Sequence, residues 1–558
     1  MLCENAAQSN DYFEFIGEYS GVLDYVKEEF NTECITVIDQ RFAIAYVKKN
    51  GRTSIYGQNY PYNTIPRCFG LMDTQMLEDV GVAQVRRSVL DLYGNGVLVG
   101  MIDTGIDYEH PAFRYEDGSS KIYSLWDQTI EGDSEDTFLG YGTEYTKEQI
   151  EEALKSDVPQ QKVPSKDESG HGTFLAGLIA GNEDNETGFS GIAPNAGLIV
   201  VKLRKAKDYL KEYYCIDPKY EAYAETDIML AVHYIDHIAE QLQRPIVIFL
   251  GIGTNLASHL GTGPLDQYLS GRAMLRGVAV VTSAGNEGQA RHHYSGQVSQ
   301  NDAKVEVKVG ESEYGFTMEL WGLAPNRYYV DIESPSGQKT GRIQGGLSGQ
   351  RYVTFLLEKT RLIVEYFTVD TSAGAPVIVM RFQNPAPGIW NIYVSDDGVG
   401  NREFDLWLPI TNFISEDTFF LESIPYNTLV APSNTGLLIS CGSYNSSTGS
   451  LAIDSSRGFP RNAVKPDFTA PGVEILGPLP RKRYGRKSGT SVSGAITAGI
   501  AALMLEWGIM QKNDMQINTT RIKNYLIRGA RRDPERIYPN REWGYGQVDL
   551  YETFLGIR

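Results

Sequence analysis

Residues 97–105 read Val-Leu-Val-Gly-Met-Ile-Asp-Thr-Gly, an apolar run that stops at an acid and a glycine turn. A continuous run of this kind is typical of a strand buried on both faces of a parallel sheet. Similar short apolar runs occur at residues 198–203, 246–250, 278–281 and 437–440. Between two of these runs, apolar residues recur at helical spacing: Ile228, Val232, Ile235 and Leu242. Alternating strands and helices predict an α/β fold, a parallel sheet with helices on both faces.

Two other regions of the sequence show different residue patterns. From Lys304 to Ile410 apolar residues alternate with period 2, and Gly, Pro, Asn and Asp cluster between the segments, which favours an inserted all-β sandwich or jelly roll. Residues 1–60 combine one helical stretch with two short strand patterns, so we expect a small α+β unit. The predicted domains are therefore 1–60, 61–300, 301–425 (the β insertion) and 426–558, with a linker at 51–66.

Composition excludes several classes of protein. The 558 residues carry 51 Lys and Arg against 70 Asp and Glu, a net charge of −19, which disfavours nucleic acid as a partner. The apolar run 495–505 is shorter than the roughly 18 residues of a membrane span, so none is expected. Five cysteines make no disulfide framework. The N-terminus lacks the pattern of a secretory signal, so cytoplasmic synthesis is expected.

Asp103 ends the first apolar run, before Thr104 and Gly105. It has a plain interpretation, a strand that ends in a polar turn. The triplet Asp-Thr-Gly also occurs in aspartic proteases, whose chemistry needs two carboxylates that share a proton. No second Asp-Thr-Gly or Asp-Ser-Gly occurs in the chain, so that alternative is rejected.

Two further motifs carry reactive side chains. His171 lies between Gly170 and Gly172 at the start of a helical pattern, although a lone histidine is more often structural than catalytic. Ser491 lies in Ser-Gly-Thr-Ser-Val-Ser-Gly-Ala (488–495), which leads into the apolar helical run. A serine at such a place is usually only a helix N-cap, and the Gly-x-Ser-x-Gly pattern of α/β-hydrolases is not matched.

Taken together, the three motifs occur in the order Asp, His, Ser, and with the α/β pattern they resemble the subtilisin-like (S8) serine protease family. The resemblance implies a Ser491 nucleophile, a His171 base, an Asp103 partner and an Asn286 oxyanion donor. It also implies substrate-binding segments Gly251-Ile252-Gly253 and Ser283-Ala284-Gly285. Two positions depart from the family pattern: Gly251 stands where serine is usual, and Ala495 replaces a proline four residues after the nucleophile.

The β insertion makes the chain look like the clostridial Csp-type subtilases, which carry a jelly-roll domain and act in spore germination on a lytic-enzyme precursor. This resemblance implies a protein or peptide substrate and association with spores. Residues 1–60 resemble the family's prodomain, which inhibits and assists folding of its own chain, and we expect self-cleavage between about Ser54 and Asn63. Some Csp relatives have lost triad residues, so a gated or inhibited regulatory protein that binds partners is the alternative.

Two ligand questions remain open from the sequence. Residues 182–186 lie where some subtilases carry a calcium loop, and Asp184 offers oxygen ligands, but an acidic turn is more often merely solvated. We therefore expect no cofactor and no metal site. A carbohydrate-binding role for the β insertion would rest on Trp321, Trp390 and Trp407, although such aromatic residues more often belong to a core.

Overall fold

The computed structural model describes residues 12–19, 22–37, 42–50, 75–131, 138–139, 141–343, 348–368, 370, 373–461 and 463–557. The chain divides into two compact units, residues 1–72 and 73–558. The predicted linker at 51–66 and the expected cleavage span at 54–63 lie outside the described residues.

The first unit is a small antiparallel sheet with one helix. Its described strands are β1 (Tyr12–Glu18), β2 (Ile35–Val37) and β3 (Phe42–Lys48), in the order β1-β3-β2, and its helix is α1 (Asp24–Phe30). Phe15 stacks on Phe30, and both rings are buried with Val26. Cys34 is disulfide-bonded, whereas Cys215 and Cys441 are free and buried. The α+β texture predicted for this segment is present, with β1 as an element that the sequence analysis did not predict.

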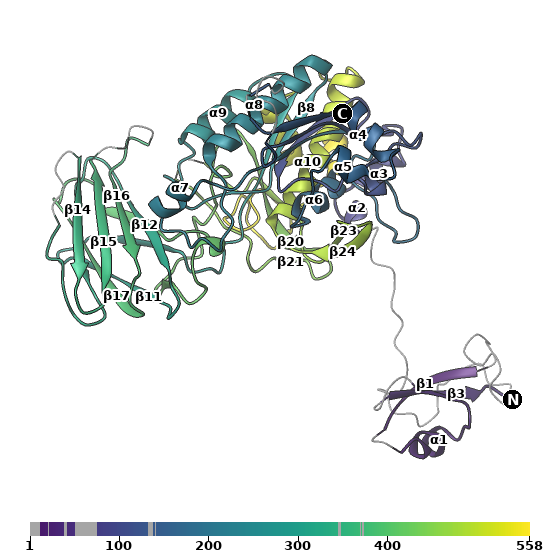
Figure 1. Cartoon of the computed structure of the whole chain (residues 1–558), viewed down its shortest axis with the longest axis horizontal. Helices are drawn as coiled ribbons and strands as arrows, with labels where there is room; N and C mark the ends of the chain where they lie inside the picture. The colour runs from purple at the N-terminus through teal and green to yellow at the C-terminus, as the bar shows by residue number, and fades with distance from the viewer. Residues whose placement is uncertain are drawn as a thin grey trace. The chain divides into compact units, whose positions relative to one another are not determined.

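The second unit is built on a sheet in which nine of the described strands take part (Figure 1). The path runs β21-β20-β9-β8-β4-β7-β5-β6, with β22 beside β20. Pairing is parallel from β20 to β5 and antiparallel at the edge strands β6 and β21. The strands are β4 (Leu98–Asp103), β5 (Ile122–Asp127), β6 (Thr143–Thr146), β7 (Gly197–Lys202), β8 (Ile246–Leu250), β9 (Val278–Ser283), β20 (Ile439–Asn445), β21 (Ser450–Leu451) and β22 (Phe468–Pro471).

Helices cover both faces of this sheet. One core cluster packs α6 (His171–Ala180) and α10 (Thr490–Leu505) on one face, and another packs α8 (Glu225–Leu242) and α9 (Pro264–Ala273) on the other. The remaining described helices are α2 (Gln75–Asp79), α3 (Val82–Arg86), α4 (Lys147–Leu154), α5 (Pro159–Lys162), α7 (Asp208–Tyr213), α11 (Thr519–Gly529) and α12 (Leu550–Ile557), with short turns at Pro111–Phe113, Thr411–Phe413 and Glu506–Met510. The predicted α/β fold is confirmed.

Helix α10 is longer than the apolar run 495–505 from which no membrane span was expected. With the following turn it runs from Thr490 to Met510, long and apolar enough to cross a bilayer, because it continues past the predicted run. However, 94% of its most apolar window is buried inside the fold. The helix is thus the core helix of the second unit, and its apolar character is explained by packing.

The β insertion is a pair of packed antiparallel sheets. Among the described strands, one sheet has the order β10-β18-β12-β16-β15-β14 and the other β13-β17-β11-β19. The strands are β10 (His293–Gln297), β11 (Ala303–Val309), β12 (Gly315–Gly322), β13 (Tyr328–Glu333), β14 (Ser348–Phe355), β15 (Thr360–Phe367), β16 (Val377–Gln383), β17 (Gly388–Asp396), β18 (Glu403–Trp407) and β19 (Phe419–Phe420).

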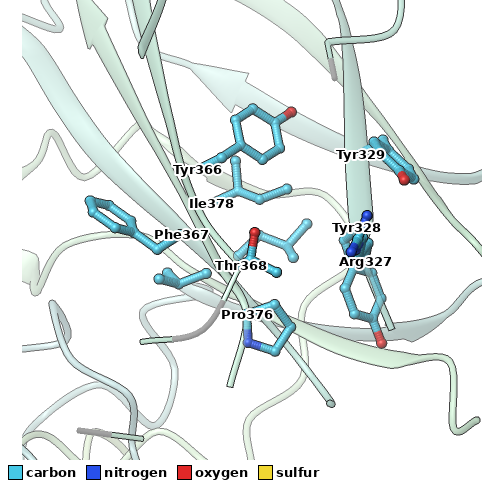
Figure 2. Close-up of a pocket in the computed structure, with 10 residues that line it drawn as sticks. Arg327, Tyr328, Tyr329, Tyr366, Phe367, Thr368, Pro376 and Ile378 are labelled. Atoms are coloured by element: carbon cyan, nitrogen blue, oxygen red, sulfur yellow. The ribbon is translucent and has the colours of Figure 1, made fainter. Parts of the chain in front are cut away.

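Of the three tryptophans considered for a sugar site, Trp321 is half-buried and the other two are part of the packing. Trp390 and Trp407 are buried, so they belong to packing. Figure 2 shows a small pocket in the sandwich, where Tyr366 and Ile378 lie near Pro376. Its volume of about 30 Å³ is room for roughly one water molecule.

Candidate active site

Asp103 is the last residue of β4, at the carboxyl end of the central strands. Its side chain is 2% exposed, and Oδ1 accepts a hydrogen bond from the Thr104 N–H at 2.8 Å. The same carboxylate lies 2.8 and 3.0 Å from Nδ1 of His171. Burial alone would raise the pKa of Asp103, but the charge and hydrogen bond of His171, with the Thr104 contacts, hold that pKa below its ordinary value.

His171 is the first residue of α6. Gly170 precedes it with φ of 69°, a left-handed conformation that glycine adopts without strain, so the chain turns sharply into the helix. The Nε2 atom of His171 lies 3.2 Å from Oγ of Ser491. Burial lowers the pKa of His171, but the charge and hydrogen bond of Asp103 outweigh it and leave the pKa above its ordinary value of 6.5.

Ser491 is the second residue of α10, after Thr490. The N-cap position is held by Gly489, which has no side chain to cap the helix, so the interpretation of Ser491 as an N-cap is wrong. Its hydroxyl is instead directed at the imidazole of His171. The first N–H groups of the helix have no intrahelical acceptor, and the helix dipole is positive at this end, so negative charge on Ser491 or on an adjacent group is favoured here.

Asn286 lies across from this serine. Its Oδ1 accepts a hydrogen bond from the Thr490 N–H at 2.9 Å, which leaves the Nδ2 group as a donor. A Cβ atom placed on Gly489 would lie 3.6 Å from Ser491 Oγ and 3.6 Å from Asn286 Nδ2. The missing side chain of Gly489 therefore leaves an open space between a hydroxyl and an amide donor, of the kind that a carbonyl group would need.

The six predicted substrate-binding residues lie at the same edge of the sheet. Gly251, Ile252 and Gly253 follow β8, and Ser283 ends β9 before Ala284 and Gly285. The segment after β9 is held by its own backbone, because the Gly285 N–H donates to Thr490 Oγ1 at 3.0 Å and the Ala284 carbonyl accepts from Val430.

The segment after β8 borders a cavity of about 570 Å³. Ile252 and Gly253 line it from the α/β unit, and Glu319 and Trp321 line it from strand β12 of the sandwich. Burial raises the pKa of Glu319 to about 7, partly opposed by the Trp321 hydrogen bond. The sequence analysis named Trp321 only as a possible sugar contact and did not name Glu319, because only the folded chain brings β12 to the end of β8.

Sequence reasoning also missed Asp167. It accepts hydrogen bonds from Gly170 N (2.8 Å), Thr173 N (2.8 Å) and Thr104 Oγ1 (2.8 Å). One buried carboxylate thus ties the start of the His171 helix to the residue after Asp103, and it lies where a negative charge complements a helix N-terminus. An acid four residues before the histidine was the available signal.

The candidate calcium loop is organised by its own hydrogen bonds. Asp184 accepts from Thr187 Oγ1 at 2.7 Å and from the Glu186 N–H at 3.2 Å. Beside the loop, the buried ammonium of Lys121 donates to the carbonyls of Ala180 (2.8 Å) and Pro194 and to the Asn182 side chain. Across the described ranges, no three His, Cys, Asp or Glu side chains group as metal ligands, and the absence of a calcium site at Asp184 stays a prediction.

Comparisons with known proteins agree with this geometry. The model of the subtilase family (Peptidase S8) matches residues 94–311 and 421–546, on either side of most of the sandwich. The structure of the Clostridium perfringens CspB protease superposes with a TM-score of 0.76 and 31% identity, covering 86% of this chain and 96% of that one.

Curated relatives are more distant. C5a peptidase of Streptococcus pyogenes serotype M1 is 22% identical over 511 residues, which are 82% of this chain and 39% of that protein. Subtilisin E of Bacillus subtilis (strain 168) is 23% identical over 206 residues, 36% of this chain and 38% of that protein. The chain thus spans about two fifths of the length of the curated relatives it matches. With matching family segments on both sides of the insertion, the chain belongs to the subtilase family of serine peptidases.

Proposed function

We propose that the protein is a serine endopeptidase that hydrolyses peptide bonds through an acyl-enzyme formed on Ser491. The observation that carries the proposal is the continuous contact from Asp103 through His171 to Ser491, with distances of 2.8 and 3.2 Å. A serine hydroxyl is a weak nucleophile at neutral pH, and a neighbouring imidazole that removes its proton overcomes this weakness.

Each residue has a distinct role in this mechanism. His171 takes the proton from Ser491 as the hydroxyl attacks the carbonyl carbon, and then gives it to the leaving amine. Asp103 remains ionised, holds the imidazole with Nδ1–H towards itself, and stabilises the imidazolium that forms. Asn286 Nδ2 and the Ser491 N–H donate to the oxyanion as it develops beside the open space at Gly489. Water then repeats the sequence on the acyl-enzyme and frees Ser491.

We propose two finer features from the resemblance to Csp-type proteases. The first is that residues 1–60 act as a prodomain whose removal is carried out by the same serine. The second is that the physiological substrate is a precursor of a lytic enzyme of spore germination. The 31% identity to the CspB protease over 86% of this chain supports both.

The experiment that tests the peptidase is labelling with a fluorophosphonate together with hydrolysis of casein. We expect wild type to be labelled and active, and Ser491→Ala to be neither. Ser488→Ala is the matched control, because it removes a hydroxyl three residues away that contacts Glu474 and not His171. Labelling of Ser491→Ala, or a casein rate above a few per cent of wild type, would overturn the assignment.

The same experiment separates the alternative of a gated regulatory protein. A gated protein would resist the label as isolated and would not cleave casein. Intact mass before and after incubation adds the test of self-processing: loss of an N-terminal fragment in wild type and not in Ser491→Ala supports it. Equal loss in both proteins would assign the cut to another protease.

A further inference from the structure

A basic hairpin stands beside the catalytic histidine. Strands β23 (Ile475–Leu479) and β24 (Arg483–Lys487) pair antiparallel, and the seven residues from 481 to 487 include five cations: Arg481, Lys482, Arg483, Arg486 and Lys487. Four of them are exposed and Lys487 is half-buried. This is a sharp local exception in a chain of net charge −19.

The hairpin is seated directly on the helix that begins with His171 (Figure 1). A Cβ on Gly177 would lie within 2 Å of the Pro478 ring, and one on Gly170 would lie 2.8 Å from the Pro480 ring. The two glycines therefore let two prolines of the hairpin pack against α6. At the other end, Lys487 Nζ donates to the Gly170 carbonyl at 3.0 Å. The cations are thus held at a set position relative to the imidazole.

This position is on the leaving-group side of the proposed reaction. His171 must give its proton to the leaving amine, so the chain that follows the scissile bond departs past the imidazole. The groups that would hold the other half of the substrate lie elsewhere, since Asn286 flanks Ser491 and residues 251–253 follow β8. Resting on the proposed peptidase function, we propose that the 481–487 hairpin binds acidic residues on the C-terminal side of the scissile bond.

Four of the five cations form no ion pair with the described residues. No ion pair within 4 Å involves Arg481, Lys482, Arg483 or Lys487 in that part of the chain. Two acids beside the hairpin accept hydrogen bonds: Asp107 accepts from the Arg481 N–H at 2.7 Å, and Glu474 accepts from Ser488. The charges of Asp167 and Asp103 act on Lys487 and oppose the lowering of its pKa by burial. Several exposed like charges in one small hairpin attract an anionic segment.

The backbone at the tip gives a second, independent observation. Arg481 and Lys482 have φ of 67° and 56°, the left-handed region that glycine and asparagine favour and long side chains avoid. Two cations therefore stand where the turn itself would favour Asn-Gly. Strain of this kind persists at functional sites, and here it holds two positive charges at the tip of the hairpin.

The experiment uses the full-length enzyme and internally quenched peptides built on the casein bond that it cuts fastest. The peptides share one N-terminal half and carry Glu-Glu, Ala-Ala or Lys-Lys after the bond. The aminomethylcoumarin amide of the same N-terminal half has no residues after the bond. We expect kcat/KM for Glu-Glu to exceed that for Lys-Lys by roughly tenfold or more in 50 mM salt, and the ratio to shrink in 0.5 M salt.

The variant Arg481→Asn/Lys482→Gly removes two charges and installs the residues that the turn favours, so its thermal midpoint should equal or exceed that of wild type. We expect its kcat/KM for the Glu-Glu peptide to fall several-fold relative to its own kcat/KM for the coumarin amide. Lys359→Gly is the matched control: an exposed lysine with φ of 57° at the distant β14–β15 turn, whose replacement should leave both rates unchanged. Should the double variant melt early, Arg483→Gln on β24 gives the same readout.

Equal cleavage of the Glu-Glu and Lys-Lys peptides by a wild-type enzyme that takes the fluorophosphonate label would overturn the proposal and leave the peptidase function intact. An equal fall of both rates in the charge variants would do so as well. Binding of dextran sulfate to the hairpin, with no preference among the peptides, would assign it to an anionic polymer and would also overturn the proposal. Absence of labelling would instead overturn the function on which it rests.

Discussion

Two of the histidine–carboxylate pairs among the described residues of the second unit have similar N–O distances but different surroundings. His171 Nδ1 lies 2.8 Å from Asp103 in the α/β unit, and His293 Nε2 lies 3.0 Å from Asp405 in the sandwich. The first imidazole is 32% exposed and its other nitrogen faces Ser491. The second is 2% exposed, stacked on Trp407 with ring centres 4.8 Å apart.

The surroundings of the two carboxylates differ as well. Asp405 also pairs with Arg461 at 2.8 Å, and although burial would raise its pKa, His293 and Arg461 lower it to about 2. Asp103 accepts hydrogen bonds from Thr104 and His171, and no Lys or Arg of the described residues forms an ion pair with it; its charge reaches Lys487 only at longer range. The comparison teaches that a His–Asp contact becomes catalytic only where the second nitrogen meets a nucleophile and the ring can reach a substrate.

The largest expected difference comes from removing each ring. His171→Ala should lower kcat by about 10⁶-fold, the size measured for loss of the base in subtilisin, a member of the same family. His293→Ala should change kcat less than tenfold but cost about 1–3 kcal/mol of stability, because it empties a buried, stacked position. Casein hydrolysis and urea unfolding of both variants check this. A catalytic loss at His293 comparable to that at His171 would break the comparison.

The next largest effect comes from neutralising each acid without changing its shape. Asp103→Asn should lower kcat by about 10⁴-fold, the loss seen for the same change in trypsin, because the amide favours the wrong tautomer of the imidazole. Asp405→Asn should leave kcat within a few-fold and lower stability, since Arg461 and His293 lose the buried charge between them. Steady-state kinetics and thermal melting separate the two, and a fall in kcat at Asp405 alone would contradict the assignment.

A smaller effect is expected at the proposed oxyanion donor, Asn286. Among the described residues, the His293–Asp405 pair of the sandwich has no such donor beside it. Asn286→Leu keeps the approximate shape of the side chain and removes Nδ2, so kcat should fall by about 10²–10³-fold, a magnitude taken from subtilisin itself, with KM nearly unchanged. The split between kcat and KM is the measurement. A rise in KM with kcat intact would place Asn286 in ground-state binding instead.

The candidate catalytic residues could be predicted from the sequence because each lies in a short local pattern. Asp103, His171 and Ser491 each follow a pattern that also determines the backbone around it: a buried strand end, a glycine turn into a helix, and a glycine-rich loop into an apolar helix. The three motifs together resemble the subtilisin-like family, and that resemblance was enough to expect that they meet.

The parts that could not be predicted depend on distant packing. His293 and Asp405 are 112 residues apart and meet only because β10 pairs with β18 in register. Trp321 borders the cavity after β8 because the two sheets of the sandwich pack beside the α/β unit. Asp167 was missed for a different reason: an acid before a helix is common, and only the coordinates show it holding Thr104. Local patterns identify elements, whereas the register of long-range strands has no short motif.

The smallest expected effect is a fall in kcat/KM of about tenfold per pH unit. It tests how the His171 region and the sandwich region respond to acid. Catalysis needs neutral His171, and since the pKa of His171 lies above 6.5, kcat/KM should fall below that higher pKa. The contribution of His171 to stability depends on pH in the opposite direction. Because the pKa of His171 is raised in the folded state, the stabilising His171–Asp103 ion pair is complete below pH 6.5 and is lost as the pH rises through the folded pKa.

At the junction with the sandwich, His259 stacks on Trp407 near His293 and Asp405, and burial lowers its pKa to about 4. Its neutral form contributes stability above 6.5 that is lost as pH falls towards 4. His259→Gln should therefore flatten the loss of thermal midpoint between pH 6.5 and 4 and leave the pH dependence of kcat/KM unchanged. A shift of the kinetic profile in this variant would show that the two histidine regions are coupled, and would break the comparison.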